Sequence, residues 1–276
     1  MTQASFPLDD GAQIPQLGFG TWQTPEEKAA TAVSAALAAG YRLIDTASIY
    51  SNETGVGKGI LASDVPREEI FVTTKLWNSQ QGYDEALRAC DESLRRLRLD
   101  YIDLYLIHWP MPLRGRYLDS WRALIVLKNE GRVRSIGVSN FQIPHLRYLL
   151  DETGVIPSVN QIELHPYFQQ RSLRAFHAQH EIITESWSPL GQGGALLRDR
   201  HVLRVAQKHR KTAAQIVLRW HLGSSLVAIP KSVNPKRIRE NFNVFDFDLD
   251  SVDYALLDSL DNPKGRIGPD PDTANF

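Results

Sequence analysis

The stretch LIDTASIYSNETGVGKG, residues 43–59, decides between two folds, because a short apolar segment is followed by a run of glycines. A doubly wound sheet that binds a dinucleotide needs its glycines directly after a strand, with an acidic residue ending the next strand. Here residues 46–52 already separate the strand end at Asp45 from Gly55, and the next strand ends in TTK, without an acid. The GFGTW segment at 18–22 lacks the last glycine. We therefore expect Gly55, Gly57 and Gly59 to lie where a helix packs closely on its neighbours.

Short apolar segments alternate with segments of helical periodicity along the whole chain. The first helix is expected to have Thr24 as N-cap and Pro25 at its first position, and to close on Gly40. An N-terminal hairpin over 6–14 is expected to turn on Asp9, Asp10 and Gly11. The candidate strands are 17–20, 41–45, 70–74, 102–108, 135–139, 159–163, 182–186 and 226–229. The candidate helices are 25–39, 82–98, 118–130 (ended by Gly131), 144–153, 170–179 and 212–222.

This alternation predicts an α/β fold, a single (β/α)8 TIM barrel. Strands too apolar to face water, each followed by a helix, are typical of a parallel sheet covered by helices. Eight such units suggest that the sheet closes, and 276 residues are compatible with one barrel domain spanning 1–276. We expect the hairpin at one end and a C-terminal tail over the barrel mouth, although the short tail after Gly265 leaves room for an open mouth.

Composition restricts the partners. The 31 basic and 32 acidic residues balance, which gives no electrostatic footprint for nucleic acid or a membrane surface. Cys90 is the only cysteine, so the chain has no internal disulfide and no cysteine cluster for zinc, and no metal is expected. The N-terminus lacks the pattern of a signal peptide, and no long uncharged apolar run is present. We expect a cytoplasmic, monomeric protein that acts on small molecules.

Polar residues gather at the carboxyl ends of the candidate strands. In a barrel these ends meet at one mouth, where active sites form. Taken singly, each has an ordinary structural explanation, such as a helix cap, a solvated lysine or a hydrogen-bonded histidine. The residues at or near these ends are Asp45, Tyr50, Lys75, His108, Ser139, Asn140, Gln161, Trp187, Ser188 and Lys231.

Four of these residues form a chemically ordered set. A phenol such as Tyr50 has an ordinary pKa of about 10, and the nearby Lys75 ammonium is expected to lower that pKa. Asp45 would keep the lysine charged and fixed. His108 would hold a substrate carbonyl beside Tyr50, which protonates its oxygen. No side chain in the set supplies a nucleophile for the carbonyl carbon, so hydride from a cofactor is the natural candidate.

The sequence resembles the aldo-keto reductase family from IPQLGFGTW to ENFNVFDFDL. Seven separated motifs carry the resemblance in the family's order and spacing, and the ESW-PLGQG and VFDFDL wording is most similar to bacterial 2,5-diketo-D-gluconate reductases. The motifs are LIDTASIYSNE, TTKLW, DYIDLYLIHWP, IGVSNF, VNQIELHPY, ESWSPLGQG and IPKSVNPKRIREN.

The resemblance implies NADPH as cofactor and a catalytic tetrad at Asp45, Tyr50, Lys75 and His108. It also implies three groups of cofactor contacts. Ser139, Asn140 and Gln161 would hold the nicotinamide carboxamide, and Trp187 would stack on the ring. The pyrophosphate contacts would be Ser188, Leu190 and Gln192, and the adenosine contacts Lys231, Ser232, Val233, Arg237 and Asn241.

The substrate pocket is expected to be apolar, with His108 as its polar group. Aldehydes, ketones and keto acids, including diketogluconate-like compounds, are the candidate substrates. Two other functions are compatible with parts of the pattern: a glycosidase using Asp45, Glu163 and Glu185, or a non-enzymatic NADPH-binding relative. The first leaves Lys75 unexplained, and an intact tetrad argues against the second. The apolar lining residues would be Trp22, Ile49, Trp77, Trp109 and Phe141.

Overall fold

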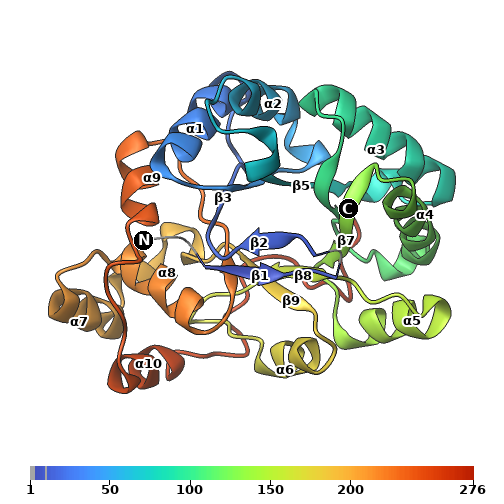
Figure 1. Ribbon diagram of the computed structural model, residues 1–276. Helices are drawn as coiled ribbons and strands as arrows, with labels where there is room; N and C mark the ends of the chain where they lie inside the picture. The colour runs from blue at the N-terminus through green and yellow to red at the C-terminus, as the bar shows by residue number, and fades with distance from the viewer. Residues whose placement is uncertain (1–3, 10) are drawn as a thin grey trace.

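Eight parallel strands form a barrel in the computed structural model, which describes residues 4–9 and 11–276 (Figure 1). The strands pair in chain order, and bridges from Leu17 to Ala228 and from Gly20 to Lys231 join the last strand to the first. The predicted (β/α)8 barrel is therefore confirmed. The strands are β3 (Gly18–Gly20), β4 (Leu43–Asp45), β5 (Phe71–Leu76), β6 (Ile102–Ile107), β7 (Val133–Ser139), β8 (Val159–Glu163), β9 (Ile183–Trp187) and β10 (Val227–Ala228).

Helices surround the barrel on its outer face (Figure 1). Short 3-10 turns, such as η1 (Ser48–Tyr50), occupy several of the loops at the strand ends. The α-helices are α1 (Glu26–Ala39), α2 (Glu53–Leu61), α3 (Tyr83–Leu97), α4 (Tyr117–Asn129), α5 (Ile143–Thr153), α6 (Arg171–Gln179), α7 (Arg200–His209), α8 (Ala213–Gly223), α9 (Pro235–Phe242) and α10 (Ser251–Asp258).

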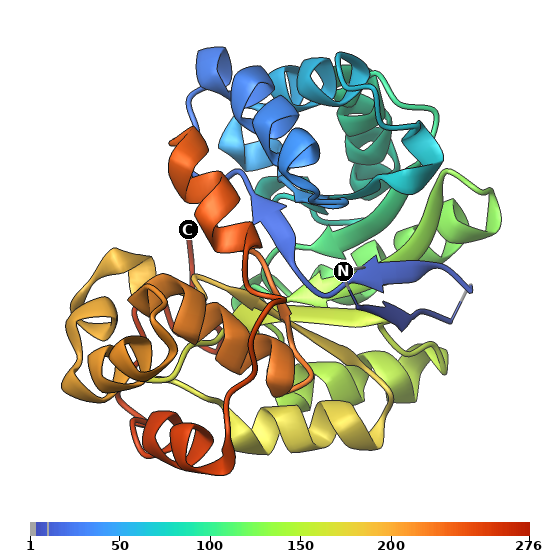
Figure 2. The ribbon, with the colours of Figure 1, turned by 60° about the vertical axis from the view of Figure 1, so that its left-hand side comes forward.

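The predicted hairpin is present as β1 (Ser5–Pro7) paired antiparallel with β2 (Gln13–Pro15). It lies across one end of the barrel (Figures 1 and 2). The Gly11 amide donates to the Leu8 carbonyl, and Gly11 has a φ of +81°, a backbone conformation that favours glycine. Asp9 ties the turn to the barrel by accepting hydrogen bonds from Lys128 and Ser158. Asp10, which was also expected in this turn, lies outside the described residues.

Two apolar cores hold the barrel together. The larger one fills the space between the sheet and the helices. The smaller one lies inside the barrel near the hairpin and combines inward-facing strand residues, such as Leu43, Leu104 and Val159, with Leu8 and Ile14 of the hairpin segment. The hairpin therefore closes this end with apolar side chains. A site built from polar groups is therefore expected at the opposite end of the barrel.

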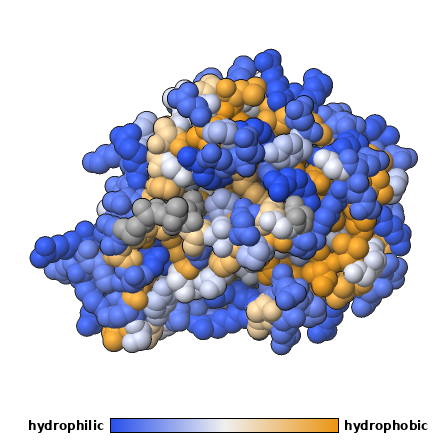
Figure 3. Space-filling model, in the orientation of Figure 1, coloured by the Kyte–Doolittle hydropathy of each residue, from blue (hydrophilic) through white to orange (hydrophobic). Residues whose placement is uncertain are grey.

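Hydrophilic side chains predominate around the rim of the hairpin face, and apolar patches lie nearer its centre (Figure 3). Among the described residues, none of the helices combines the length and the apolar character needed to cross a membrane.

The glycines of α2 pack against two neighbouring helices, as expected. A Cβ on Gly55 or Gly59 would meet main-chain carbonyls of α1 at 2.7 Å, and a Cβ on Gly57 would overlap the main-chain carbonyl of Leu97 at the end of α3. These three positions therefore let α2 approach its neighbours more closely than any residue with a side chain would allow.

Several local expectations were wrong. Helix α1 begins at Glu26, and the Thr24 hydroxyl is buried without a hydrogen-bond partner among the described residues, so Thr24 does not cap the helix. The strand expected over 226–229 is reduced to Val227–Ala228. Helices α7 and α10 were not predicted, although Asp199 and Asp250 cap them. By contrast, α1 does close on Gly40, and Thr212 caps α8 in a capping box with Gln215.

We predict that Gly57→Ala destabilises the protein by about 3 kcal/mol or more, because the added methyl group overlaps a main-chain atom that has no room to move. This strain outweighs the gain of about 1 kcal/mol that Ala brings to a helix. Denaturant unfolding of wild type and variant measures the difference. The matched control is Gly115→Ala, at a glycine that has open space around it and a φ of +63°. There we expect the free energy of unfolding to fall by only about 1 kcal/mol, from backbone strain. Equal losses in the two variants would contradict this account.

Candidate active site

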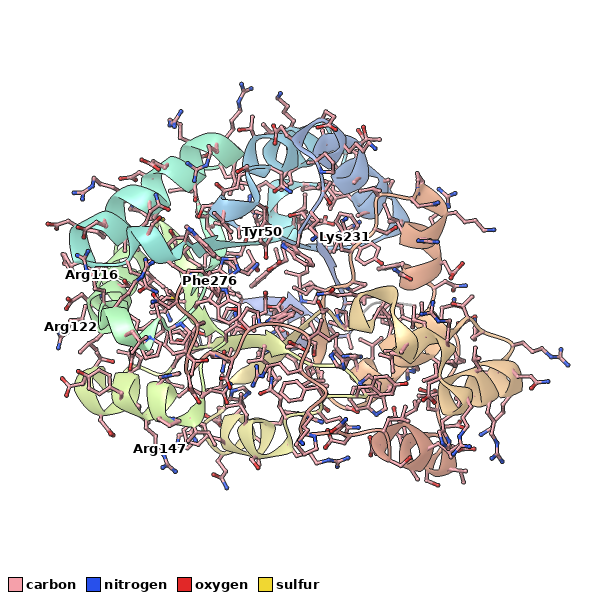
Figure 4. The ribbon with its side chains drawn as sticks, turned by 180° about the vertical axis from the view of Figure 1, so that it is seen from behind. Tyr50, Arg116, Arg122, Arg147, Lys231 and Phe276 are labelled. Atoms are coloured by element: carbon pink, nitrogen blue, oxygen red, sulfur yellow. The ribbon has the colours of Figure 1, made fainter. Side chains whose placement is uncertain are left out.

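The predicted site residues meet at the end of the barrel opposite the hairpin. Figure 4 views the molecule from that side, with Tyr50, Lys231 and Phe276 over the central region and Arg122 and Arg147 at the edge. Strand alternation explains why side chains from separate strands converge here, because every second residue of each strand points into the barrel. A groove of about 590 Å³ lies at the other end, lined by residues such as Phe6 and Ile182, and contains none of the predicted site residues.

Lys75 and Asp45 form a buried ion pair inside the mouth. The Lys75 Nζ donates to both Asp45 carboxylate oxygens, at 2.7 and 2.8 Å, and to the main-chain oxygen of Thr46 at 2.8 Å. The lysine side chain is 0% exposed. Burial acts to lower the pKa of Lys75, but Asp45 together with Tyr50 and Glu185 outweighs it, so the pKa lies above its ordinary value and the ammonium stays charged. Burial raises the pKa of Asp45, while Lys75 acts in the opposite direction.

Tyr50 lies next to this pair at the end of η1. The Lys75 Nζ is 5.3 Å from the centre of the Tyr50 ring, and the Ser48 hydroxyl holds η1 to β5 by donating to the Lys75 carbonyl. The Lys75 ammonium acts to lower the Tyr50 pKa, as expected, but the expected net fall is wrong. Burial raises that pKa more than the Lys75 ammonium lowers it. The phenol is therefore protonated at neutral pH.

His108 follows β6 and completes the set. Its ring centre is 5.7 Å from that of Tyr50 and 5.2 Å from that of Trp77, edge-on to both rings. Burial, with Lys75 as the second cause, holds the pKa of His108 well below its ordinary value. Its Nδ1 atom has no hydrogen-bond partner among the described residues. The imidazole is therefore neutral and is able to donate one hydrogen bond to a substrate oxygen.

The Gln161 amide lies below this set, between two carboxyl groups. Its Nε2 donates to Asp45 at 2.8 Å and to Glu185 at 2.9 Å. The sequence placed Glu185 near a strand end but did not connect it with the tetrad. The available signal was strand alternation: Gln161 and Glu185 are paired residues of neighbouring strands that both point inward. Burial, followed by the nearby Asp45, raises the pKa of Glu185 to about 8.

Trp187, Asn140 and Ser139 form a connected group on the other side of the mouth. The half-buried Trp187 donates from its indole N–H to the Asn140 side-chain oxygen at 2.8 Å. The Asn140 side-chain nitrogen in turn donates to the His108 carbonyl and to the Ser139 hydroxyl. These bonds fix the indole ring in one orientation, which suits a planar ring that stacks on it.

The loops after β9 and β10 bring together most of the other expected cofactor residues. Lys231 is partly buried, which lowers its pKa, and its Nζ donates to the Gln23 carbonyl. Arg237 is exposed on the first turn of α9, and its guanidinium makes no ion pair or hydrogen bond with any residue that the structure describes. An exposed helix start with cationic side chains beside it is suited to a phosphate group. Of the remaining residues, Ser188, Leu190 and Ser232 are partly buried, Gln192 and Val233 are exposed, and Asn241 is buried.

Four of the five expected pocket residues reach the surface or the aromatic group at the mouth. Trp22 and Ile49 are 44% and 42% exposed. Ile49 and Trp77 line an open cleft of about 430 Å³ beside η1. Trp109 packs with Trp77 in a small apolar cluster. Phe141 differs, because it is fully buried against Tyr117 and His145, so its ring is shielded from the mouth.

The C-terminal tail crosses the mouth, so the possibility of an open mouth was wrong. The Glu163 carboxylate accepts hydrogen bonds from the main-chain amides of Ile267 and Gly268, at 2.6 and 2.8 Å. At the other side, the ring of Phe276 stacks on Trp77 and lies edge-on to Trp109. Phe276 thus joins the aromatic group of Trp77 and Trp109 at the mouth, which the sequence did not reveal. No periodic pattern or motif marks it, because its contacts are with residues more than 160 positions away.

Comparison of the sequence with known proteins identifies the family of this chain. The model of the aldo/keto reductase family matches residues 16–262. A protein named aldo-keto reductase from Mycolicibacterium smegmatis is 55% identical over 98% of this chain and 97% of its own. A methylglyoxal reductase, DkgA, of Escherichia coli K12 is 55% identical over 96% of both chains. The chain belongs to the aldo/keto reductase family.

Solved structures support the same assignment. The crystal structure of Gox0644 in its apo form superposes with a TM-score of 0.96, with 54% identity and complete coverage of both chains. An aspartate-to-alanine variant of Gox0644 has been solved in complex with NADPH, and it superposes with a TM-score of 0.96 at 53% identity.

We predict that Glu185 makes the stability of the protein depend on pH. Its folded-state pKa of about 8 lies above the ordinary value of 4.5, so the folded protein binds more protons than the unfolded chain between these values. Stability therefore falls as pH rises from about 5 to 8, by up to about 1.4 kcal/mol per pH unit. Glu185→Gln keeps an acceptor oxygen for Gln161 but removes the titration. Thermal unfolding across this range should show the wild type losing stability relative to the variant, whereas parallel curves would contradict the assignment.

Proposed function

We propose that this protein is an NADPH-dependent reductase of small aldehydes, ketones or keto acids, with Tyr50 as the proton donor. The observation that carries the proposal is the Tyr50 phenol placed beside the buried Lys75–Asp45 pair and the neutral His108. When bound, NADPH supplies a hydride for the carbonyl carbon. The reduction of a carbonyl then requires one proton at oxygen, which is what this chain provides.

His108 and Tyr50 have different roles at the substrate oxygen. The neutral His108 donates a hydrogen bond that holds the carbonyl oxygen beside the phenol. As negative charge develops on that oxygen, Tyr50 transfers its proton. The Lys75 ammonium stabilises the phenolate that remains, and Asp45 prevents the lysine from losing its charge.

The residues of the mouth fit a bound dinucleotide. Trp187, whose indole is tied to Asn140, provides a flat platform for the nicotinamide. Ser139, Asn140 and Gln161 are the proposed contacts of the carboxamide. The exposed guanidinium of Arg237 at the start of α9 suits the 2′-phosphate that distinguishes NADPH from NADH.

Small dicarbonyl compounds are the substrates that we propose to test first. Relatives that are 55% identical to this chain are named methylglyoxal reductases, and the ESW-PLGQG wording is similar to diketogluconate reductases. An aromatic wall of Trp77, Trp109 and Phe276 suits a compact substrate with an apolar face. Oxidation of NADPH in the presence of methylglyoxal, 2,5-diketogluconate and a simple aldehyde tests the class. No turnover with any carbonyl compound would favour a non-enzymatic role.

A glycosidase is a poorer explanation of the same barrel. The Glu163 carboxylate is occupied by the main-chain amides of the tail, and Glu185 is fully buried below the mouth. Neither is free to act on a sugar, and family membership points to redox chemistry.

We predict that Tyr50→Phe lowers turnover by about 10²-fold or more, because the ring remains but the transferable proton is lost. Binding of NADPH should be retained, since the variant keeps the aromatic surface. Steady-state rates and a fluorescence titration measure the two effects. Tyr148→Phe, at an exposed position on α5, is the matched control and should behave as wild type. Turnover within a few-fold of wild type in the Tyr50 variant would refute the assignment.

We also predict that Arg237→Ala weakens NADPH binding by about 10- to 150-fold and leaves NADH nearly unchanged. A charge-assisted hydrogen bond to the 2′-phosphate contributes about 1.5 to 3 kcal/mol, and NADH lacks that phosphate. Paired titrations with the two cofactors measure the change. Arg239→Ala, on the same helix and also exposed, serves as the control. Equal losses for both cofactors would show that Arg237 supports the helix and does not recognise the phosphate.

A further inference from the structure

The Gln161 side chain is held between two acids, and this arrangement defines its orientation. Both of its hydrogen-bond partners, Asp45 Oδ2 and Glu185 Oε2, are carboxyl oxygens that accept from Nε2. An amide has hydrogens only on its nitrogen, and the ionised Asp45 carboxylate can only accept, so the nitrogen faces the acids. The carbonyl oxygen of Gln161 therefore points away from both of them.

A glutamate at position 185 is unfavourable for the stability of the fold. Its side chain is 0% exposed, and its second oxygen, Oε1, has no hydrogen-bond partner among the described residues. The nearby Asp45 also disfavours the ionised form of Glu185. Inward-facing neighbours in the same barrel, such as Leu106 and Ile229, are apolar. A buried, half-satisfied carboxyl destabilises a core that an apolar residue would fill, which points to a functional role.

Asp45 alone would leave the amide incompletely held. Asp45 already accepts two hydrogen bonds from Lys75, and it accepts one amide hydrogen from Gln161. The other amide hydrogen has its acceptor in Glu185. Without Glu185 that hydrogen would be buried and unpaired, and a tilt of the amide that turned the donor toward the mouth would be favourable.

We propose that Glu185 is a positioning residue that makes Gln161 present its carbonyl oxygen, and not its N–H groups, to the cofactor. This inference rests on the proposed function, in which Gln161 contacts the nicotinamide carboxamide. A carboxamide carries both a donor NH2 and an acceptor oxygen. With both amide hydrogens of Gln161 engaged, Gln161 recognises only the NH2 group. Glu185 thereby selects a cofactor with a donor at this position.

The test compares NADPH with its reduced 3-acetylpyridine analogue, in which a methyl group replaces the NH2. Binding is measured by fluorescence titration without substrate, so the readout is independent of turnover. Loss of one hydrogen bond corresponds to about 2- to 13-fold in Kd, and wild type should prefer NADPH by a factor in this range. In Glu185→Met, which has a similar length but no carboxyl, this preference should fall toward unity. Glu185→Gln keeps an acceptor oxygen and should retain it.

Three further variants make the result decisive. Asp103→Asn alters another buried carboxyl, which pairs with Arg67 and Arg134, and should leave the preference unchanged. If Glu185→Met does not fold, as judged by thermal unfolding, Glu185→Val provides the same comparison. Gln161→Ala should abolish the preference. Two outcomes would overturn the positioning role while the cofactor contact stands. In the first, Gln161→Ala abolishes the preference for NADPH but Glu185→Met or Glu185→Val leaves it intact. In the second, Glu185→Gln abolishes the preference as well. No effect of Gln161→Ala would overturn the contact itself.

Discussion

The ion pair between Lys75 and Asp45 is the interaction on which the mouth of the barrel depends. An ammonium buried this completely would be strongly destabilising without a partner. Here Asp45 and the Thr46 carbonyl occupy the ammonium, so the lysine has one defined position. The relation of Tyr50 and His108 to a fixed positive charge follows from that position. Loss of either partner would leave a buried charge uncompensated, and the neighbouring groups would then rearrange.

Desolvation gives these groups their chemical character. Burial keeps His108 neutral and raises the pKa of Tyr50 despite the nearby ammonium. A phenol that resists ionisation is a poor acid by itself, and this protects it from losing its proton to solvent. Charge developing on a bound carbonyl oxygen changes that balance at the moment of reaction. The apolar layer of Leu43, Leu104 and Val159 below the site contributes to the low dielectric that makes these effects large.

The tail joins the two sides of the mouth. Glu163 anchors it near β8, where Gly268 lies so close to Trp187 that a Cβ would come within 2.6 Å of the indole. At the other side, Phe276 rests on Trp77. The proposed cofactor platform and the proposed substrate wall are therefore in contact with the same short segment. A change in the tail would therefore alter the packing of both surfaces.

The sequence by itself determined the barrel and the positions of most strands, and it singled out the four residues that we propose as the tetrad. These follow from local patterns: apolar periodicity marks the strands, and polar residues at the ends of apolar strands stand out. The tertiary structure alone decided that burial raises the pKa of Tyr50, that Phe141 is shielded, and that Phe276 stacks on Trp77. It also decided that Glu185 shares the Gln161 amide with Asp45. Burial and contacts between residues far apart in the chain depend on how the whole barrel closes, and no local pattern carries that information.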